Sequence, residues 1–296
     1  MRFMFALAIL CSMCIFADEG IRIDDSPISK DKYGHSWHVA SNFDTPESTY
    51  YDKATNTIYV SNVAGSPTDK DGKGFIQKLD INGSMIDASF VSGLNAPKGM
   101  RIHKGTLWVS DIDRVISINV KDGSITQIIE ISGSAFLNDI AVDDNGVVYV
   151  SDMMANKIFK IENNKPTVFT AGPEVEYPNG LLIENGNLVV AAWGNRGRKG
   201  RLYSVNLKTK NKKLITEEPL GNLDGLELDV DGNYLVSDWI AGKVFRIQKD
   251  GKVKVLLYGF KGSADLGYIP EKQLLILPRM KENAVTAYDL SKYPKD

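Results

Sequence analysis

Cysteine is almost missing from this chain of 296 residues, which has two, Cys11 and Cys14. Histidine is nearly as scarce, with three residues in the whole sequence. Beyond position 14 the chain therefore has neither disulfides nor a thiol nucleophile, and it offers no thiolate to a metal. Its stability must come from a hydrophobic core, for which a hydrophobic content of 43% is an ordinary supply.

A strong charge of either sign is also missing, since the formal net charge is −2 at pH 7. A nearly neutral chain has no overall field that would attract nucleic acid or an anionic membrane surface, and we expect neither as a partner. The glycine-rich run GSPTDKDGKG, residues 65–74, lacks the spacing and the Ser or Thr after Lys of a phosphate-binding loop. Nucleotide binding is therefore not indicated.

Long hydrophobic runs are confined to the N-terminus, where an apolar stretch from Phe3 to Phe16 follows the basic Arg2 and ends at the small residue Ala17. This pattern is typical of a secretory signal peptide, with cleavage expected after Ala17. A membrane-spanning helix needs about 20 apolar residues, so a retained N-terminal anchor is the less favoured alternative. We expect residues 1–17 to be a signal peptide and the mature chain to be periplasmic or secreted, without membrane contact. Both cysteines would leave with the signal.

A repeat of about forty residues runs through the remaining chain. Each copy reads as an apolar strand, a glycine turn, a second strand that often ends in Ser-Asp, a short turn and a third strand. The six copies span residues 48–65, 99–125, 139–166, 180–209, 225–253 and 265–290. No helical periodicity competes with this pattern, which predicts an all-β protein, a six-bladed β-propeller. We expect residues 18–296 to form this single domain, with residues 18–42 either padding its rim or supplying the outer strand that closes the ring.

Polar residues recur where the first strand of each copy begins. The first strand of a propeller blade lines the central channel, so equivalent residues there form a ring at one mouth. The ring positions are Glu47, Lys98, Asn138, Asn179, Asp224 and Ala264, with Asp265 next to the last. Four of them, Glu47, Asn138, Asn179 and Asp224, would bring together carboxylate and amide oxygens. Such an all-oxygen set favours a hard cation, Ca²⁺ before Mg²⁺, whereas zinc more often recruits His or Cys.

An alternative interpretation of the same residues is that Asn, Asp and Gly only form the turn into each inner strand. It accounts well for Asn138 and Asn179 and poorly for Glu47. The histidines, His35, His38 and His103, all lie outside the ring positions.

Four short motifs at these positions resemble the SMP-30/gluconolactonase/LRE-like family of six-bladed propellers, and more distantly the phosphotriesterases and paraoxonases. The motifs are PES at 46–48, LND at 137–139, PNGL at 178–181 and LDGLELD at 223–229. The resemblance implies hydrolysis of lactones or related esters at a divalent metal in the channel. It implies that Glu47, Asn138, Asn179 and Asp224 hold the metal and that Asp224 also acts as base or nucleophile. The chain departs from the family in having Ser48 and Thr49 after Glu47, where Gly-Pro and an aromatic residue are usual.

Lys98 gives the ring a cation that a metal site does not need. Its ammonium would either compete with a metal for Glu47 and Asp224, hold a substrate carboxylate or oxyanion as a catalytic residue, or extend outward to solvent. Two functional hypotheses follow. The first is an exported metal-dependent hydrolase of lactones or small esters, acting on a small-molecule substrate. The second is a non-catalytic periplasmic or secreted binding propeller with a polar cluster of Lys98, Glu47 and Asp224. The sequence does not determine the oligomeric state.

Two further patterns are assigned to structure before chemistry. The repeated Ser-Asp endings place Asp111, Asp152 and Asp238 at equivalent sites, where we expect them to cap the turn between the second and third strands. The aromatic neighbours of the ring are Tyr50, Trp193 and Trp239, which fit a substrate-pocket lining and a blade-interface core equally well.

Overall fold

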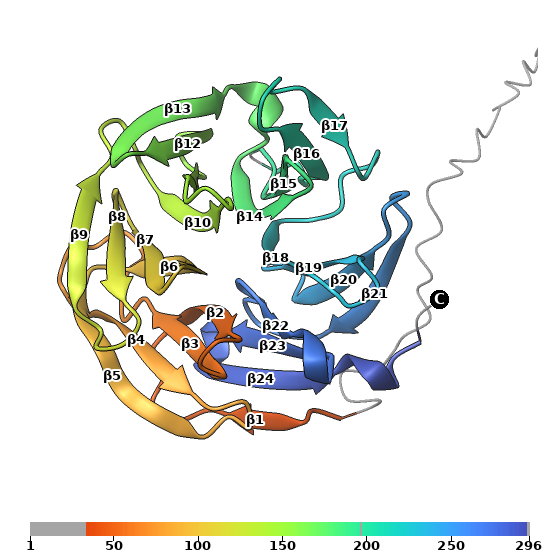
Figure 1. The fold of residues 1–296 in the computed structure, drawn as a ribbon. Helices are drawn as coiled ribbons and strands as arrows, with labels where there is room; N and C mark the ends of the chain where they lie inside the picture. Colours follow the sequence, from red (N-terminus) through yellow and green to blue (C-terminus); the bar gives the residue numbers. More distant parts are fainter. Residues whose placement is uncertain (1–33, 196, 295–296) are drawn as a thin grey trace, which may run out of the picture.

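The computed structural model describes residues 34–195 and 197–294, and the expected signal peptide, residues 1–17, lies outside them. The described chain forms six four-stranded sheets arranged around a central axis, a six-bladed β-propeller as the repeat predicts (Figure 1). All strands within a sheet pair antiparallel. Among the described residues, no helix has the length and apolar character needed to span a bilayer.

The first three blades follow the chain in order from the inner to the outer strand. Blade 1 consists of β2 (Pro46–Asp52), β3 (Thr57–Asn62), β4 (Gly74–Leu79) and β5 (Met85–Leu94). Blade 2 consists of β6 (Pro97–His103), β7 (Thr106–Asp111), β8 (Arg114–Asn119) and β9 (Ile125–Glu130). Blade 3 consists of β10 (Leu137–Val142), β11 (Val148–Asp152), β12 (Lys157–Glu162) and β13 (Lys165–Ala171).

The next two blades repeat this order, and the last one differs in its outer strand. Blade 4 consists of β14 (Pro178–Glu184), β15 (Asn187–Ala192), β16 (Leu202–Asn206) and β17 (Lys212–Leu214). Blade 5 consists of β18 (Leu223–Leu228), β19 (Tyr234–Asp238), β20 (Lys243–Ile247) and β21 (Val253–Tyr258). Blade 6 consists of β22 (Gly267–Ile269), β23 (Leu274–Arg279), β24 (Ala284–Asp289) and β1 (Trp37–Val39). Short 3₁₀ helices lie at Pro173–Val175, Pro270–Lys272, Met280–Glu282 and Leu290–Lys292.

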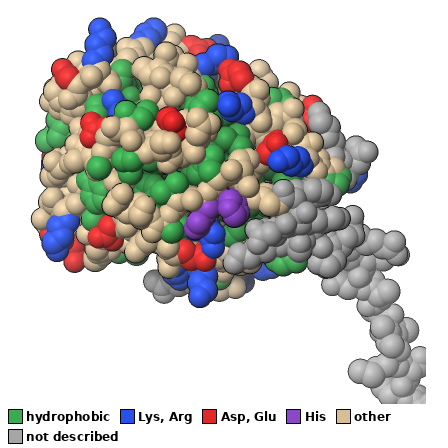
Figure 2. Space-filling model, turned by 90° about the horizontal axis from the view of Figure 1, so that it is seen from below, with side chains coloured by type: hydrophobic (Ala, Val, Ile, Leu, Met, Phe, Trp, Pro, Cys, Tyr) green, Lys and Arg blue, Asp and Glu red, His purple; other side chains and the backbone are tan. Residues whose placement is uncertain are grey.

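The outermost strand of blade 6 comes from the opposite end of the chain. β1 pairs with β24, with Trp37 opposite Ala287 and Val39 opposite Val285, so the N-terminal segment supplies the closing strand rather than padding the rim. The Trp37 indole nitrogen also donates to the Ile81 carbonyl of blade 1, at 3.0 Å. β1 therefore joins the last blade to the first. Figure 2 shows the molecule from this side, with histidine side chains near one another on its surface.

Aspartates fix the hairpin turns between the first two strands of several blades. In blade 3 the Asp143 carboxylate accepts the N–H groups of Asn145 and Val147, both at 2.9 Å, while Gly146 takes a positive φ of 84°. Asp229 does the same in blade 5. These hydrogen bonds pair the backbone N–H groups of the turn locally, so a tight turn is stable even where it is exposed to solvent. The same Asp and Gly residues are the ones that predict a turn from the sequence.

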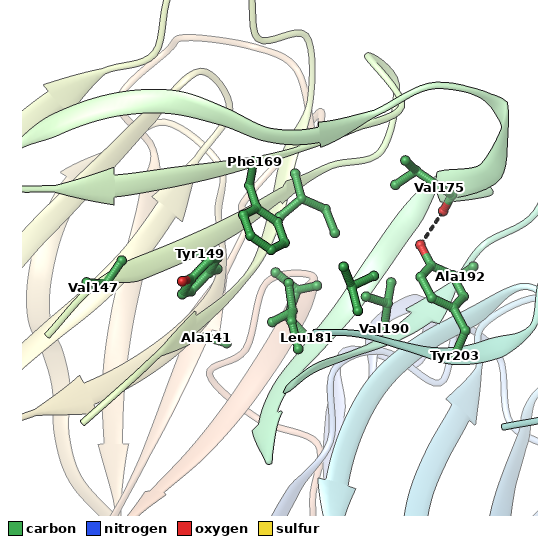
Figure 3. Close-up of a cluster of buried hydrophobic side chains, with 12 residues drawn as sticks. Ala141, Val147, Tyr149, Phe169, Val175, Leu181, Val190, Ala192 and Tyr203 are labelled. Carbon is green, nitrogen blue, oxygen red and sulfur yellow. Dashed lines mark hydrogen bonds between the residues drawn. The ribbon is translucent and has the colours of Figure 1, made fainter. Parts of the chain in front are cut away.

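The hydrophobic core is divided among the blade interfaces. Six of the clusters of buried side chains in the described part of the chain each combine residues from two neighbouring blades, one cluster for each interface. Figure 3 shows the one between blades 3 and 4, where Phe169 and Tyr149 face Leu181 and Val190, and the Tyr203 hydroxyl donates to the Val175 carbonyl at 2.6 Å. Each sheet thus packs against a neighbouring blade on both of its faces, so apolar residues on either face of a strand are buried.

Candidate metal and catalytic site

A one-residue β-bulge begins the inner strand of blades 1 to 5. In blade 1, Pro46 pairs with Asn62 and Ser48 with Ser61, so Glu47 is the extra residue on the inner strand. The same shift places one ring residue inside each of the other bulges: Lys98, Asn138, Asn179 and Asp224. A bulge leaves a residue unpaired in the ladder and redirects its side chain. The local backbone thus presents these five residues at equivalent places.

A serine near the end of the second strand holds the bulge in place in blades 1, 3 and 5. Its Oγ accepts the backbone N–H that follows the ring residue, which the interrupted ladder would otherwise leave unpaired: Ser61 binds Ser48, Ser151 binds Asp139 and Ser237 binds Gly225, at 2.8–3.0 Å. The serine is buried in all three cases. Part of the repeated motif therefore serves the ring directly.

The aspartates of the Ser-Asp endings also cap backbone: Asp152 and Asp238 cap the expected turn between the second and third strands, and Asp111 and Asp152 cap the loop that enters the inner strand. Asp152 accepts the N–H of Ala155 in the turn between the second and third strands. It also accepts the N–H groups of Ala135 and Phe136 in the loop that enters the inner strand, at 2.7 and 3.0 Å. Asp111 binds the corresponding loop of blade 2. These carboxylates are structural, and they fix the approach to each bulge.

Glycines follow several ring residues because neighbouring inner strands approach closely there. A Cβ on Gly180 would lie 2.0 Å from the Asp224 carbonyl oxygen, and a Cβ on Gly225 would lie 2.7 Å from the Asp265 Cα. The strand bounds include all of these residues: Asn179 and Gly180 are in β14, and Asp224 and Gly225 are in β18. The interpretation of these residues as a turn leading into the strand is wrong.

All five polar ring residues are buried, with side chains at most 5% exposed. Ala264 is buried as well, and the Asp265 N–H donates to the Glu47 carbonyl at 2.9 Å, which joins blade 6 to blade 1 at the channel. The structure thus brings the sequence-predicted residues together around one axis. The histidines lie elsewhere: His38 is in β1, His35 is beside it, and His103 ends β6.

Two oxygens of the expected metal-binding set have no hydrogen-bond partner. Glu47 Oε2 and Asn179 Oδ1 are both fully shielded from solvent and unpaired. The Asn179 amide nitrogen donates to the Leu223 carbonyl at 3.2 Å, and the same amide lies beside the Asp224 carboxylate. Buried polar atoms are almost always paired, so these two oxygens are available to a further partner, as is Asp265 Oδ1 in the same channel.

Burial also makes the two ring carboxylates difficult to ionise without a cation. Burial raises the pKa of Glu47 well above its ordinary value, and the nearby charges of Asp224 and Asp265 raise it further. Burial and then Asp139 and Asp238 raise the pKa of Asp224 in the same way, while the Asn179 amide opposes the shift. Within residues 34–195 and 197–294, no three His, Cys, Asp or Glu side chains cluster as metal ligands. The candidate set combines two carboxylates with two amides.

Lys98 is not an outward-pointing surface lysine. It is 1% exposed, its ammonium donates to the Ala96 carbonyl at 2.9 Å, and it lies 4.5 Å from the centre of the Phe136 ring. Of the three alternatives for Lys98, extension to solvent is therefore wrong. Burial lowers the pKa of Lys98 to about 8, although Glu47 and Asp111 oppose this shift. No ion pair in the described part of the chain joins Lys98 to Glu47 or Asp224.

A second polar layer in the channel was missed by the sequence analysis. Arg101 is buried, and its guanidinium lies 3.4 Å from Glu227, 3.8 Å from Asp139 and 3.9 Å from Asp265. It also lies 5.6 Å from the centre of the Tyr50 ring. Burial disfavours the Arg101 charge, but the three carboxylates outweigh burial and raise its pKa. The signal was present: Tyr50, Arg101 and Glu227 each stand three positions after a ring residue.

The carboxylates of this layer are tied down by further hydrogen bonds. Asp139 accepts the N–H groups of Ile140 and Leu181 at 2.6 and 2.7 Å, and the Ser48 hydroxyl donates to Asp265 at 2.6 Å. The Arg101 guanidinium also donates to the Met100 carbonyl. Arg101 therefore holds carboxylates from blades 3, 5 and 6 together beneath the ring.

The comparisons with known proteins agree with this architecture. The family model for the SMP-30/Gluconolactonase/LRE-like region matches residues 45–257. No curated protein matches the chain.

Solved structures with the same fold are distant in sequence. A nidogen/laminin complex has a chain with a TM-score of 0.65 at 18% identity, covering 79% of this chain and 90% of its own. Virginiamycin B lyase from Staphylococcus aureus has a TM-score of 0.59 at 13% identity, covering 82% and 81%. A streptogramin B lyase structure has a TM-score of 0.58 at 12% identity, covering 84% and 95%. At these identities the likeness shows the propeller fold alone.

Proposed function

Because the chain belongs to the SMP-30/gluconolactonase/LRE-like family, which includes lactonases, we propose that it is a metal-dependent hydrolase of lactones or small esters. We further propose Ca²⁺ as the metal, held by Glu47, Asn138, Asn179 and Asp224. The N-terminal segment supports export to the periplasm or secretion from the cell. The proposed substrate is a small molecule.

The unpaired oxygens of Glu47 and Asn179 are the observation that carries this proposal. They come from blades 1 and 4 at equivalent bulges, and their neighbours in the ring supply further oxygens. Hard cations such as Ca²⁺ take carboxylate and amide oxygens as ligands, and a channel mouth leaves room for water. The residues present therefore fit such an ion. When bound, it polarises a substrate carbonyl and lowers the pKa of a bound water.

Asp224 is the proposed general base. Burial and the nearby Asp139 raise the pKa of the Asp224 carboxyl, and a cation bound beside it would favour its ionised form, which is the form that accepts a proton. In this mechanism Asp224 takes a proton from water as the oxygen adds to the carbonyl carbon. The proton then passes to the alkoxide oxygen as the ester C–O bond breaks, which gives a carboxylic acid and an alcohol.

Lys98 acts on the ring through its charge in this proposal. Its ammonium is bound to the Ala96 carbonyl, and Glu47 is the strongest of the charges that favour its protonated form. It thereby limits the repulsion between Glu47 and the other carboxylates. A plug made of Lys98, Glu47 and Asp224 is less favoured, because the Lys98 ammonium is bound to the Ala96 carbonyl and, among the described residues, forms no ion pair with either carboxylate.

Metal content and thermal stability test the proposal without relying on activity. Ca²⁺ at a hundred times its Kd would stabilise the folded protein by about 2.7 kcal/mol. That corresponds to a rise in Tm of roughly 5–10 °C for a domain of this size. Asp224→Asn should lose most of this rise and reduce kcat/KM on a lactone panel by about 10²-fold or more. The matched control is Asp144→Asn, since Asp144 is exposed in a hairpin turn.

Two results would contradict the proposal. One is a Tm that does not change at millimolar Ca²⁺ in protein that also contains no metal by elemental analysis. The other is an Asp224→Asn variant that hydrolyses lactones as well as the Asp144→Asn control.

A further inference from the structure

The residue that immediately follows the second strand is apolar in every blade. These six residues, here called the mouth arc, are Val63, Ile112, Met153, Trp193, Trp239 and Met280. Short loops between strands usually begin with polar or turn-forming residues, so six apolar residues at one structural position are unexpected. The pattern points to a shared environment at one end of the channel.

Backbone hydrogen bonds place the mouth arc directly next to the ring. The N–H of Trp193 donates to the Tyr177 carbonyl at 2.8 Å, and the N–H of Trp239 donates to the Asn222 carbonyl at 3.0 Å. Each acceptor stands two positions before a ring residue, Asn179 or Asp224. The N–H groups of Val63 and Met153 make the equivalent bonds to Thr45 and Phe136. The mouth arc therefore lies one step beyond the ring, on the side from which the inner strands start.

Side-chain contacts join most of the mouth arc into a continuous apolar surface. The rings of Trp193 and Trp239 are 5.8 Å apart and tilted by 52°. The Trp239 indole nitrogen lies 3.4 Å from the Met280 sulfur, and Met280 packs against the cluster of Val63, Ala96 and Ile112. The contacts therefore run from blade 4 through blades 5, 6 and 1 to blade 2.

Part of this surface is open to solvent. Val63 and Ile112 are buried, whereas Met153, Trp193, Trp239 and Met280 are partly exposed. Two neighbours extend it outward, Met154 at 58% and Ile240 at 62% exposure. Lys281 covers one face of Trp239, with its ammonium 4.0 Å from the ring centre. Exposed apolar residues that adjoin a polar site are typical of ligand recognition.

We propose that the substrate carries a hydrocarbon portion that lies on the mouth arc, so that the site prefers alkyl- or aryl-substituted lactones and esters to polyhydroxylated sugar lactones. This inference rests on the proposed function, because the ring has to act on the carbonyl of the same molecule. The polar groups of the mouth arc are two indole N–H groups and the methionine sulfurs, and one indole already faces Met280. Sugar hydroxyl groups would lose water there and gain few partners beyond the Lys281 ammonium, whereas an alkyl or aryl group would gain burial.

The first test is a substrate series with the Ca²⁺-loaded protein. We expect kcat/KM for γ-alkyl butyrolactones to rise by about fourfold per methylene until the hydrocarbon covers the mouth arc, since each buried methylene contributes about that factor. Glucono-1,5-lactone should be a poor substrate. Equal or better hydrolysis of glucono-1,5-lactone would overturn the inference while leaving the proposed function intact.

Variants of Trp193 separate recognition from folding. Trp193→Ala should reduce the ratio of kcat/KM for long over short alkyl chains by roughly tenfold or more. Trp193→Phe should recover much of that preference. The matched control is Trp108→Phe, since Trp108 packs between blades 2 and 3. An unchanged chain-length dependence in Trp193→Ala would count against the mouth arc.

A binding measurement decides the case in which no lactone or ester is hydrolysed. That result would refute the proposed function, and quenching of tryptophan fluorescence by butyrate, octanoate and gluconate would then test the mouth arc alone. Tighter binding of octanoate than of butyrate and gluconate, lost in Trp193→Ala, supports an apolar ligand site. Equal affinity for the three carboxylates overturns it.

Discussion

At the scale of single residues, the buried carboxylates of the channel divide into two groups according to the charge that balances them. Asp139, Glu227 and Asp265 share the guanidinium of Arg101. Among the described residues Glu47 and Asp224 form no ion pair, although the nearby Lys98 ammonium favours the ionised form of Glu47. A buried carboxylate is stable only with a compensating charge or with its own proton. The first group is therefore part of the scaffold, and the second is the group that a cation would complete.

Replacing Arg101 tests this division. Arg101→Met keeps much of the side-chain volume but leaves three buried carboxylates without their cation. Breaking a buried ion pair in this way costs about 3–5 kcal/mol. Urea denaturation should show the lower free energy of unfolding, and Arg198→Met, at an exposed loop position, should change it by less than about 0.5 kcal/mol. A stability of Arg101→Met equal to that of the control would mean that the carboxylates are protonated and need no counter-charge.

The ring was predictable from the sequence and the layer beneath it was not, for a physical reason. Glu47, Asn138, Asn179 and Asp224 stand at equivalent points of a repeat, so aligning the copies locates them. Arg101 occupies its register once, and its partners come from three other blades. Contacts between blades depend on how the inner strands face each other across the channel. A single sequence gives no direct measure of that arrangement.

At the scale of elements, the bulge changes the meaning of the motif Pro-Asn-Gly at 178–180. From the sequence it resembles a turn, because proline, asparagine and glycine favour turns. In the structure these residues are in β14, with Asn179 as the bulged residue. Gly180 is required by the close approach of the next blade and has no role in a turn. Asparagine and glycine are thus used within a strand here. A bulge, like a turn, contains a residue outside the ladder pairing and requires a small residue where the backbone of a neighbouring strand is close.

The short strand β1 should respond to pH through His38. Its Nδ1 is hydrogen-bonded to the Thr286 hydroxyl of β24 at 2.8 Å. Partial burial lowers the pKa of His38, Arg279 and His35 lower it further, and Glu282 opposes the shift. The folded protein thus binds this proton less readily than the unfolded chain, whose histidine has a pKa of 6.5. The contribution to stability is complete above that pH and is lost as the pH falls toward the lowered pKa.

Hydrogen exchange at β1 measures this response. After correction for intrinsic rates, the amides of Trp37 to Val39 should be less protected at pH 5.5 than at pH 7.5. The effect should be small because His38 is largely accessible. His38→Gln should remove the difference, whereas His103→Gln, in β6, should keep it. Equal protection of the wild-type strand at both pH values would show that His38 does not couple proton binding to the pairing of β1.

At the scale of the whole molecule, the propeller fold can be predicted from the sequence because its six blade interfaces have similar composition. Each blade buries one face of its sheet against the preceding blade and the other against the next, so every strand has to carry apolar residues at regular spacing. The number of repeats then sets the number of blades. How the circle closes was left open between two alternatives, because three residues of β1 carry little sequence signal.

Removing β1 should show how much of the stability depends on closure of the circle. The strand covers the edge of β24 through its pairing with Val285 to Ala287, and Trp37 packs with the cluster between blades 6 and 1 while bonding to the Ile81 carbonyl. A variant without residues 1–41 loses these contacts and exposes an unpaired edge, whereas one without residues 1–33 keeps them. The longer deletion should cost about 2–4 kcal/mol relative to the shorter one. It should also promote association through the free edge of β24. Paired urea denaturation curves and light scattering measure both effects. Identical midpoints for the two variants would mean that the interface between β22 and β2, with its bond from Asp265 to Glu47, closes the circle without β1.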